Sequence, residues 1–199
     1  MISFALFSAL ATFYFTMFFT PGPNNAMLTA SGMKFGFIRT LPHLIGISLG
    51  HIFQIGLTCF GLANIFLIYP EVQLYMKILC FLYLIYLSWK MIGSFSLTQK
   101  ETGRPLRFYE ASLFQFINPK AWSIAVTVAS GFFPSEEHIF IGVAFVTITA
   151  AVINLPTCSL WALFGSGLRK FVNNEKTKKI IEYLLAVLLV LTGLFILFK

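Results

Sequence analysis

Six long apolar segments occupy most of this sequence, and they restrict it to one class of fold. They run over about Phe4–Gly32, Leu41–Ile68, Val72–Ser94, Phe108–Phe133, Ile139–Phe164 and Ile180–Phe198. Each is near or above the roughly 20 residues that a helix needs to cross a bilayer. In lipid every backbone N–H and C=O must be paired inside the protein, which a helix does within itself. We therefore expect one all-α integral membrane domain over residues 1–199, with six transmembrane helices.

The composition leaves no room for a soluble domain beside these segments. Of the residues, 58% are hydrophobic and 11% are charged, whereas soluble domains carry about 25% charged residues. The net charge of +7 would suggest a nucleic-acid partner in a soluble protein. Here the basic residues fall in short loops between apolar segments, so we interpret them as topology signals and expect no nucleic-acid partner.

The basic residues are concentrated on one side of the expected membrane domain. Eleven lie around the first–second, third–fourth and fifth–sixth connections: Lys34, Arg39, Lys90, Lys100, Arg104, Arg107, Arg169, Lys170, Lys176, Lys178 and Lys179. The other side has only Lys77 and Lys199, and Lys120 falls inside the fourth segment. Because cytoplasmic loops are enriched in Lys and Arg, we expect the first set inside the cell and both termini outside.

Proline interrupts two of the six segments, at Thr20-Pro-Gly-Pro-Asn-Asn25 and at Asn118-Pro-Lys120. Proline removes a backbone donor and clashes with the preceding turn, so neither helix should continue through its motif. Non-helical backbone at membrane depth survives only inside protein or beside a cavity, and transporters bind cargo at such breaks. Two more segments follow each break. The sequence thus predicts two three-helix repeats, about residues 1–96 and 107–199, the second inverted relative to the first.

The first break supplies five candidate substrate-binding residues, Pro21, Gly22, Pro23, Asn24 and Asn25. Asn24 and Asn25 directly follow the prolines and can cap the helix that resumes there. The free N–H groups and positive dipole end of a helix start attract an anion, such as the carboxylate of an amino acid. The alternative is a bent helix whose asparagines only satisfy backbone groups.

The second break supplies Asn118, Pro119 and Lys120. Lys120 lies about 18 Å into its segment at roughly 1.5 Å per residue, where a lysine costs about 2.5–3.5 kcal/mol. Such a residue usually faces the interior of the helix bundle. We expect Lys120 to line the same pocket as Asn24, and the alternative is a side chain that extends to the membrane surface.

Three polar residues in other segments are further candidates, namely His51, Gln54 and Asn154. His51 follows Gly46-x-x-x-Gly50, a spacing that lets another helix approach closely. An imidazole changes charge near neutral pH, so His51 could carry a proton. A neutral histidine bonded within the bundle is the competing interpretation. Asn154 could face the same pocket or only contribute to packing.

Three motifs together resemble the LysE/RhtB-type family of bacterial amino-acid exporters. They are Thr20-Pro-Gly-Pro-Asn24, Gly46-Ile-Ser-Leu-Gly50 and Phe116-Ile-Asn-Pro-Lys-Ala121, and the similarity extends over essentially the whole chain. The resemblance implies a bacterial inner-membrane transporter, not an enzyme, without a cofactor, that exports small neutral amino acids or derivatives in exchange for protons. It leaves a homo-oligomer open.

The sequence departs from the family pattern at His51, where many members have Asp. In this it is similar to the members that export cysteine and O-acetylserine. Threonine and homoserine belong to the same class of expected cargo.

Two other functions fit a membrane protein of this size. A heavy-metal exporter would need His, Cys or carboxylate ligands clustered at mid-membrane, and only His51 and Glu110 come near. A transmembrane thiol oxidoreductase would place a cysteine beside each break. Cys59, Cys80 and Cys158 are all more than ten residues from Pro21–Pro23 and Pro119, and we interpret them as small buried hydrophobic residues without a metal or redox role.

Overall fold

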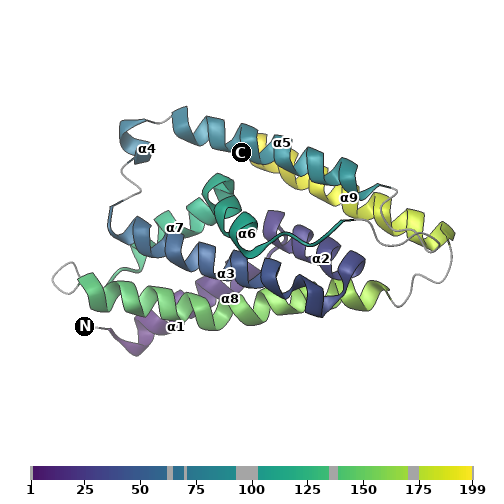
Figure 1. Ribbon diagram of the computed structural model, residues 1–199. Helices are drawn as coiled ribbons and strands as arrows, with labels where there is room; N and C mark the ends of the chain where they lie inside the picture. Colours follow the sequence, from purple (N-terminus) through teal and green to yellow (C-terminus); the bar gives the residue numbers. More distant parts are fainter. Residues whose placement is uncertain are drawn as a thin grey trace.

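A computed structural model describes residues 2–61, 65–69, 71–92, 103–134, 139–169 and 175–198, and these ranges contain helices and no strand. The helices are α1 (Phe4–Phe19), α2 (Pro23–Phe35), α3 (Phe37–Cys59), α4 (Ile65–Ile68), α5 (Glu71–Met91), α6 (Phe108–Phe114), the 3₁₀ turn η2 (Gln115–Ile117), α7 (Pro119–Gly131), α8 (Ile139–Arg169) and α9 (Glu175–Phe198) (Figure 1). Of the basic residues used to predict orientation, Lys100, Lys170 and Lys199 lie outside the described residues. The predicted all-α class is confirmed.

Four helices are individually long and apolar enough to cross a bilayer. They are α3, α8, Glu71–Trp89 of α5 and Lys179–Phe198 of α9. The pair α1 and α2, bent by 54°, makes a fifth if it counts as one span. The fourth apolar segment of the sequence is divided among α6, η2 and α7. The described part of the chain thus has four to five candidate spans.

The second apolar segment differs from its predicted boundaries. Helix α3 begins at Phe37 instead of Leu41, so Pro42 lies inside the helix and not in its first turn. The cause is Gly36, whose φ of 80° makes a sharp corner directly after α2. At the other end α3 stops at Cys59, and Gly61, with a φ of 100°, lies beyond it. The predicted continuation to Ile68 is therefore wrong, since α4 is a separate short helix.

Glycines bring α2 and α8 close together, and these two helices have the most extensive contact of any helix pair in the described chain. A Cβ added at Gly32 would collide with the carbonyl of Ala162, and one at Gly165 would collide with the carbonyl of Thr29. The two backbones approach closely only because both positions lack a side chain.

The spacing Gly46-x-x-x-Gly50 makes a similar contact between α3 and α6. A Cβ at Gly46 would collide with the carbonyl of Phe108, and one at Gly50 would lie 2.6 Å from the Cα of Ser112. The Ser112 hydroxyl donates to the carbonyl of Gly46 at 2.9 Å. The prediction that these glycines admit another helix is confirmed, and the helix that they admit leads directly into the second proline interruption.

Helices α5 and α9 form a pair that packs mainly on itself (Figure 1). The hydroxyl of Ser88 on α5 donates to the carbonyl of Ala186 on α9 at 3.0 Å. Cys80 and Leu84 of α5 and Leu189 of α9 pack with Met27 of α2 and Phe114 of α6 in one buried cluster. The pair therefore contacts the remaining helices over a limited area.

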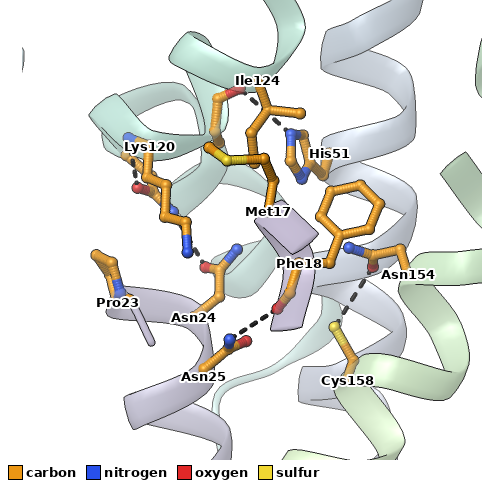
Figure 2. A pocket seen from close by; sticks show the side chains of 13 residues that line it. Met17, Phe18, Pro23, Asn24, Asn25, His51, Lys120, Ile124, Asn154 and Cys158 are labelled. Carbon is orange, nitrogen blue, oxygen red and sulfur yellow. Dashed lines mark hydrogen bonds between the residues drawn. The ribbon is translucent and has the colours of Figure 1, made fainter. Parts of the chain in front are cut away.

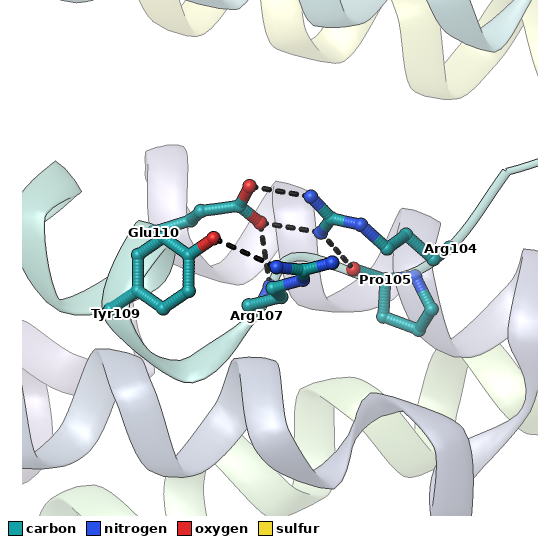
Figure 3. Close-up of polar contacts among 5 residues, drawn as sticks. All are labelled: Arg104, Pro105, Arg107, Tyr109 and Glu110. Atoms are coloured by element: carbon teal, nitrogen blue, oxygen red, sulfur yellow. Dashed lines mark hydrogen bonds and ion pairs between the residues drawn. The ribbon is translucent and has the colours of Figure 1, made fainter.

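An ion pair fixes the point where α6 begins (Figure 3). Both carboxylate oxygens of Glu110 accept bonds of 2.6 Å from the guanidinium of Arg104, and Glu110 also accepts the backbone N–H of Arg107 at 2.7 Å. The N–H of Arg107 would otherwise lack an acceptor at the helix start. Glu110 thus has a structural role at this helix start.

Candidate functional site

The first interruption is a sharp bend between α1 and α2, with Gly22 at the N-cap and Pro23 in the first turn of α2. The expectation that Asn24 and Asn25 cap α2 is wrong, because no side chain caps that helix. Pro23 starts the helix early enough that both asparagines lie inside it, and side chains there point back toward the helix start. Asn25 instead donates to the last carbonyls of α1, those of Phe18 and Thr20, both at 2.8 Å.

The second interruption lies between η2 and α7. Asn118 is the N-cap of α7, and its side-chain oxygen accepts the N–H of Lys120 at 3.1 Å. Pro119 occupies the first turn, where its missing N–H has no consequence. The indole of Trp122 donates to the carbonyl of Phe116 at 3.0 Å and so satisfies one carbonyl that the interruption frees.

A cluster of three amides joins the two interruptions. Asn24 of α2 donates to Gln115 of η2 at 2.9 Å, and both Gln115 and Asn118 donate back to the Asn24 oxygen at 3.3 Å. Gln115 is fully buried. Gln115 was not among the predicted residues, although an amide in an apolar segment three residues before Asn118 was the available signal.

The side chain of Lys120 forms a second link between the interruptions. Its ammonium donates to the carbonyl and hydroxyl of Thr20 at 2.7 and 3.0 Å, and to the carbonyl of Pro21 at 3.3 Å. These carbonyls follow the C-terminal end of α1, where the helix dipole favours a cation. The ammonium thus lies against α1 and beside Gly22, where an added Cβ would be 2.9 Å from the Cδ of Lys120.

His51 is buried beside these elements and has a defined tautomer. Its Nε2 lies 3.3 Å from the carbonyl of Ala121, and since a carbonyl only accepts, Nε2 carries the proton of the neutral ring. Nδ1 is then an acceptor, and no donor reaches it within the described residues. The ring of Phe18 packs edge-on against the imidazole at 5.4 Å.

Residues from both interruptions and from α3 and α8 line one small cavity (Figure 2). Eight of the residues singled out from the sequence lie on it: Gly22, Pro23, Asn24, Asn25, His51, Asn118, Lys120 and Asn154. Five other residues also line it and were not predicted as site residues: Met17, Phe18, Ala121, Ile124 and Cys158. The volume is about 20 Å³, little more than one water needs. No carboxylate is present among these lining residues.

The remaining predicted residues lie elsewhere. Pro21 and Pro119 line a second, large cavity of about 610 Å³ that borders the small one. Gln54 lines neither cavity; its amide donates to the backbone carbonyl of Gln115 at 3.0 Å, which supports η2. Cys158 is buried, as predicted, and it also lies on the small cavity, where its thiol donates to the Asn154 oxygen at 3.4 Å.

A metal site is not formed by the candidate ligands. Within the described ranges no three His, Cys, Asp or Glu side chains come together. Glu110 is paired with Arg104 and does not line the small cavity with His51.

The small cavity therefore offers two kinds of partner to a ligand. The ammonium of Lys120 and the start of α2 provide positive charge and N–H donors. His51 and Asn154 also line the cavity; Nδ1 of His51 is a buried acceptor without a partner among the described residues, and the side-chain oxygen of Asn154 accepts from the Cys158 thiol. A molecule with a carboxylate at one end and an ammonium at the other matches this arrangement.

Comparison with known proteins agrees with the resemblance drawn from the motifs. The chain is 29% identical over 161 residues to the "Cysteine/O-acetylserine efflux protein" of Escherichia coli (strain K12) and to that of Salmonella typhi, which is 80% of this chain and 82% of each relative. No solved structure matches the chain. The model of the LysE type translocators matches residues 15–199. Together with the apolar helices, this match indicates a multi-pass inner-membrane transporter and not an enzyme. The chain belongs to the LysE type translocator family.

Proposed function

We propose that this protein is a secondary transporter that exports small, mostly neutral amino acids or their derivatives, in the class of cysteine, O-acetylserine, threonine and homoserine, in exchange for protons. The observation that carries the proposal is the convergence of both proline interruptions on one cavity with an ammonium, a helix start and a free imidazole acceptor. The printed function of the relatives supports the cargo class.

The proposed architecture is one domain of six spans in two inverted repeats. In it α1 and α2 form the first span and α6, η2 and α7 the fourth, and two long helices follow each, α3 and α5 in one repeat and α8 and α9 in the other. The Lys and Arg distribution supports cytoplasmic placement of Gly103 and an external C-terminus. A reporter active only outside the cytoplasm should then be active when fused after Lys199 and silent when fused at Gly103.

The cargo carboxylate binds, in this proposal, between the start of α2 and Lys120. Both are positive, and Lys120 already donates to backbone oxygens there. A carboxylate is a stronger acceptor than a carbonyl, because charge-assisted hydrogen bonds are roughly twice as strong as neutral ones. The cargo can thus displace one bond of the ammonium and take its place.

Competition at Nδ1 of His51 would couple transport to protons. The neutral ring can accept a hydrogen bond from the cargo ammonium, whereas a protonated ring would repel it. Lys120 of α7 and Cys158 of α8 are the other ionisable groups on the cavity. None of the lining residues carries a carboxylate, so a protonated His51, the Lys120 ammonium and the cargo ammonium would place three positive charges against the one carboxylate of the cargo. Mutual exclusion of cargo and proton is the requirement for antiport.

The small cavity must open before it can hold an amino acid. About 20 Å³ leaves room for about one water, which is far less than any amino acid needs. Met17 and Lys120 line both this cavity and the large one. Both side chains are unbranched with several rotatable bonds, and their movement would join the two spaces.

Efflux measurements on a panel of cargo test the proposal. Cells that overproduce the protein should release, and resist toxic amounts of, at least one of cysteine, O-acetylserine, threonine and homoserine. Cells that produce the Lys120→Ala variant to the same membrane level are the control, and they should behave as cells without the protein. Resistance to cadmium or zinc without any amino-acid effect would support the metal exporter instead.

A further inference from the structure

The large cavity is lined by polar side chains from three separate helices. Gln73 and Lys77 come from α5, Ser123 and Thr127 from α7, and Thr192 from α9. All of these helices are apolar, and Gln73, Ser123 and Thr127 are exposed. Polar groups on the lipid face of a span are unfavourable. Their convergence from three directions on one space of about 610 Å³ indicates a wet cavity and not a lipid contact.

The charge of this cavity has one sign. Lys77 lies on its α5 wall and Lys120 on its α7 wall, and none of the lining residues is Asp or Glu. Two ammonium groups in a space partly walled by apolar residues create a positive potential, which raises the local concentration of anions. The ligand class that fits is a small solute with a carboxylate.

The two cavities meet at Lys120. Met17, Gly22, Pro23 and Lys120 line both, so the lysine side chain lies on the boundary between them. A carboxylate bound to this ammonium in the small cavity can pass to the large one without leaving the lysine. Lys77 then offers the next positive charge.

We propose that the large cavity is a second binding site, a water-filled vestibule in which the cargo carboxylate lies between Lys120 and Lys77 after it leaves the small cavity. The assignment of direction rests on the proposed function. With both termini outside, the start of α5 and the end of α9 face the external side, so Gln73, Lys77 and Thr192 lie on the exit half of the path.

A cysteine introduced at Ser123 reports on this cavity. The variant Ser123→Cys is made with Cys59→Ser, because Cys59 is half-buried while Cys80 and Cys158 are buried. The purified protein is placed in vesicles of phosphatidylcholine, a zwitterionic lipid without net charge, so that no anionic lipid competes. Labelling rates are measured with negatively and positively charged methanethiosulfonates of similar size. The matched control is Ser130→Cys, which is exposed on the same helix but lines neither cavity.

For each variant we take the ratio of the labelling rate with the negative reagent to that with the positive reagent. We expect this ratio to be about tenfold higher for Ser123→Cys than for Ser130→Cys. Adding Lys77→Gln should remove much of this preference, and Lys77→Arg, which keeps the charge, should retain it. Threonine or acetate in excess should slow labelling at position 123 and not at position 130. Equal charge preference at the two positions, no labelling at position 123, or no effect of Lys77→Gln would overturn the vestibule.

The labelling experiment tests the vestibule independently of the proposed cargo class. The labelling ratio depends on the charge and wetness of the cavity and requires no transport. If the efflux panel fails while the ratio holds, the cargo class is wrong and the anion-selective vestibule stands. If the panel succeeds while the ratio is equal at both positions, the vestibule is wrong and the small cavity remains the only proposed site.

Discussion

The two proline interruptions differ in the chemistry that they present to the cavity. Between α1 and α2 the chain bends by 54° and leaves the carbonyls of Thr20 and Pro21 facing Lys120. Between η2 and α7 the chain continues through a capped helix start and presents the ammonium of Lys120 itself. One interruption supplies acceptors and a positive helix start, and the other supplies a mobile cation. Two similar-looking motifs in sequence thus build an asymmetric site, which suits the zwitterionic cargo that we propose.

The largest effect is expected from removing the cation of the second interruption. Lys120→Ala should lower efflux by about 100-fold, since a hydrogen bond to a charged group contributes up to about 3 kcal/mol. Lys120→Arg should restore little, because the planar guanidinium cannot occupy the place of a compact ammonium. Efflux is normalised to the amount of protein in the membrane, which should not fall when an intramembrane charge is removed. Lys179→Ala, at an exposed position on α9, should transport normally.

The next effect concerns the space that the first interruption leaves for Lys120. A Cβ at Gly22 would lie 2.9 Å from Cδ and 3.1 Å from Nζ of Lys120. Gly22→Ala should therefore displace the flexible end of the lysine without harming the fold, and lower efflux about tenfold, equivalent to about 1.4 kcal/mol. Gly131→Ala and Gly167→Ala are matched controls, since an added Cβ there meets nothing within 4 Å. Equal losses in all three variants would mean that the position of Lys120 is not the cause.

A change in coupling, with a smaller change in rate, is expected at His51. Glutamine can accept and donate hydrogen bonds but takes up no proton near neutral pH. His51→Gln should keep exchange of labelled for unlabelled cargo at equal pH within about threefold, while a pH gradient should no longer drive accumulation. His43→Gln on the same helix, outside both cavities, should still respond to the gradient. Gradient-driven transport in His51→Gln would show that another group carries the proton.

The smallest effects are on stability, and they should also differ between the interruptions. Asn25→Ala leaves the buried carbonyl of Phe18 without this donor, which costs about 1–3 kcal/mol, whereas the carbonyl of Thr20 keeps Lys120 as a donor. Asn118→Ala removes one helix cap, at about 1 kcal/mol, and a 3.3 Å bond to the Asn24 oxygen, which keeps Gln115 as a donor. In detergent, Asn25→Ala should therefore unfold at a lower temperature than Asn118→Ala. The reverse order would mean that the second interruption is the more dependent on its side-chain cap.

The fold was most predictable from the sequence at positions where the residue type alone determines the local backbone or packing. The apolar segments predict helices, and the described chain is helical. Gly46 and Gly50 predict a close helix contact, and α6 makes it. Helices end or begin at Pro23 and Pro119, as the loss of a backbone donor requires. In each case the reason lies within a few residues of the chain.

Partners from distant parts of the chain were not predictable in the same way. Gln115 bonds Asn24, 91 residues away, and Cys158 reaches the small cavity from α8. These contacts depend on which helices lie together, and periodicity within one segment does not specify that. The end of α3 was missed for a local reason, since the hydropathy of residues after Cys59 stays high while Gly61 turns the chain.

The most direct test of the central claim compares binding of a cargo with binding of its carboxamide. Calorimetry in detergent would measure the affinities of the purified parent protein and of its Lys120→Ala variant for threonine and for threoninamide. The account predicts that the parent protein prefers threonine by about 10- to 100-fold, the equivalent of one charge-assisted hydrogen bond. It also predicts that Lys120→Ala binds the two ligands almost equally. If Lys120→Ala keeps the full preference for the carboxylate, the cargo does not bind at Lys120 and the proposed site is wrong.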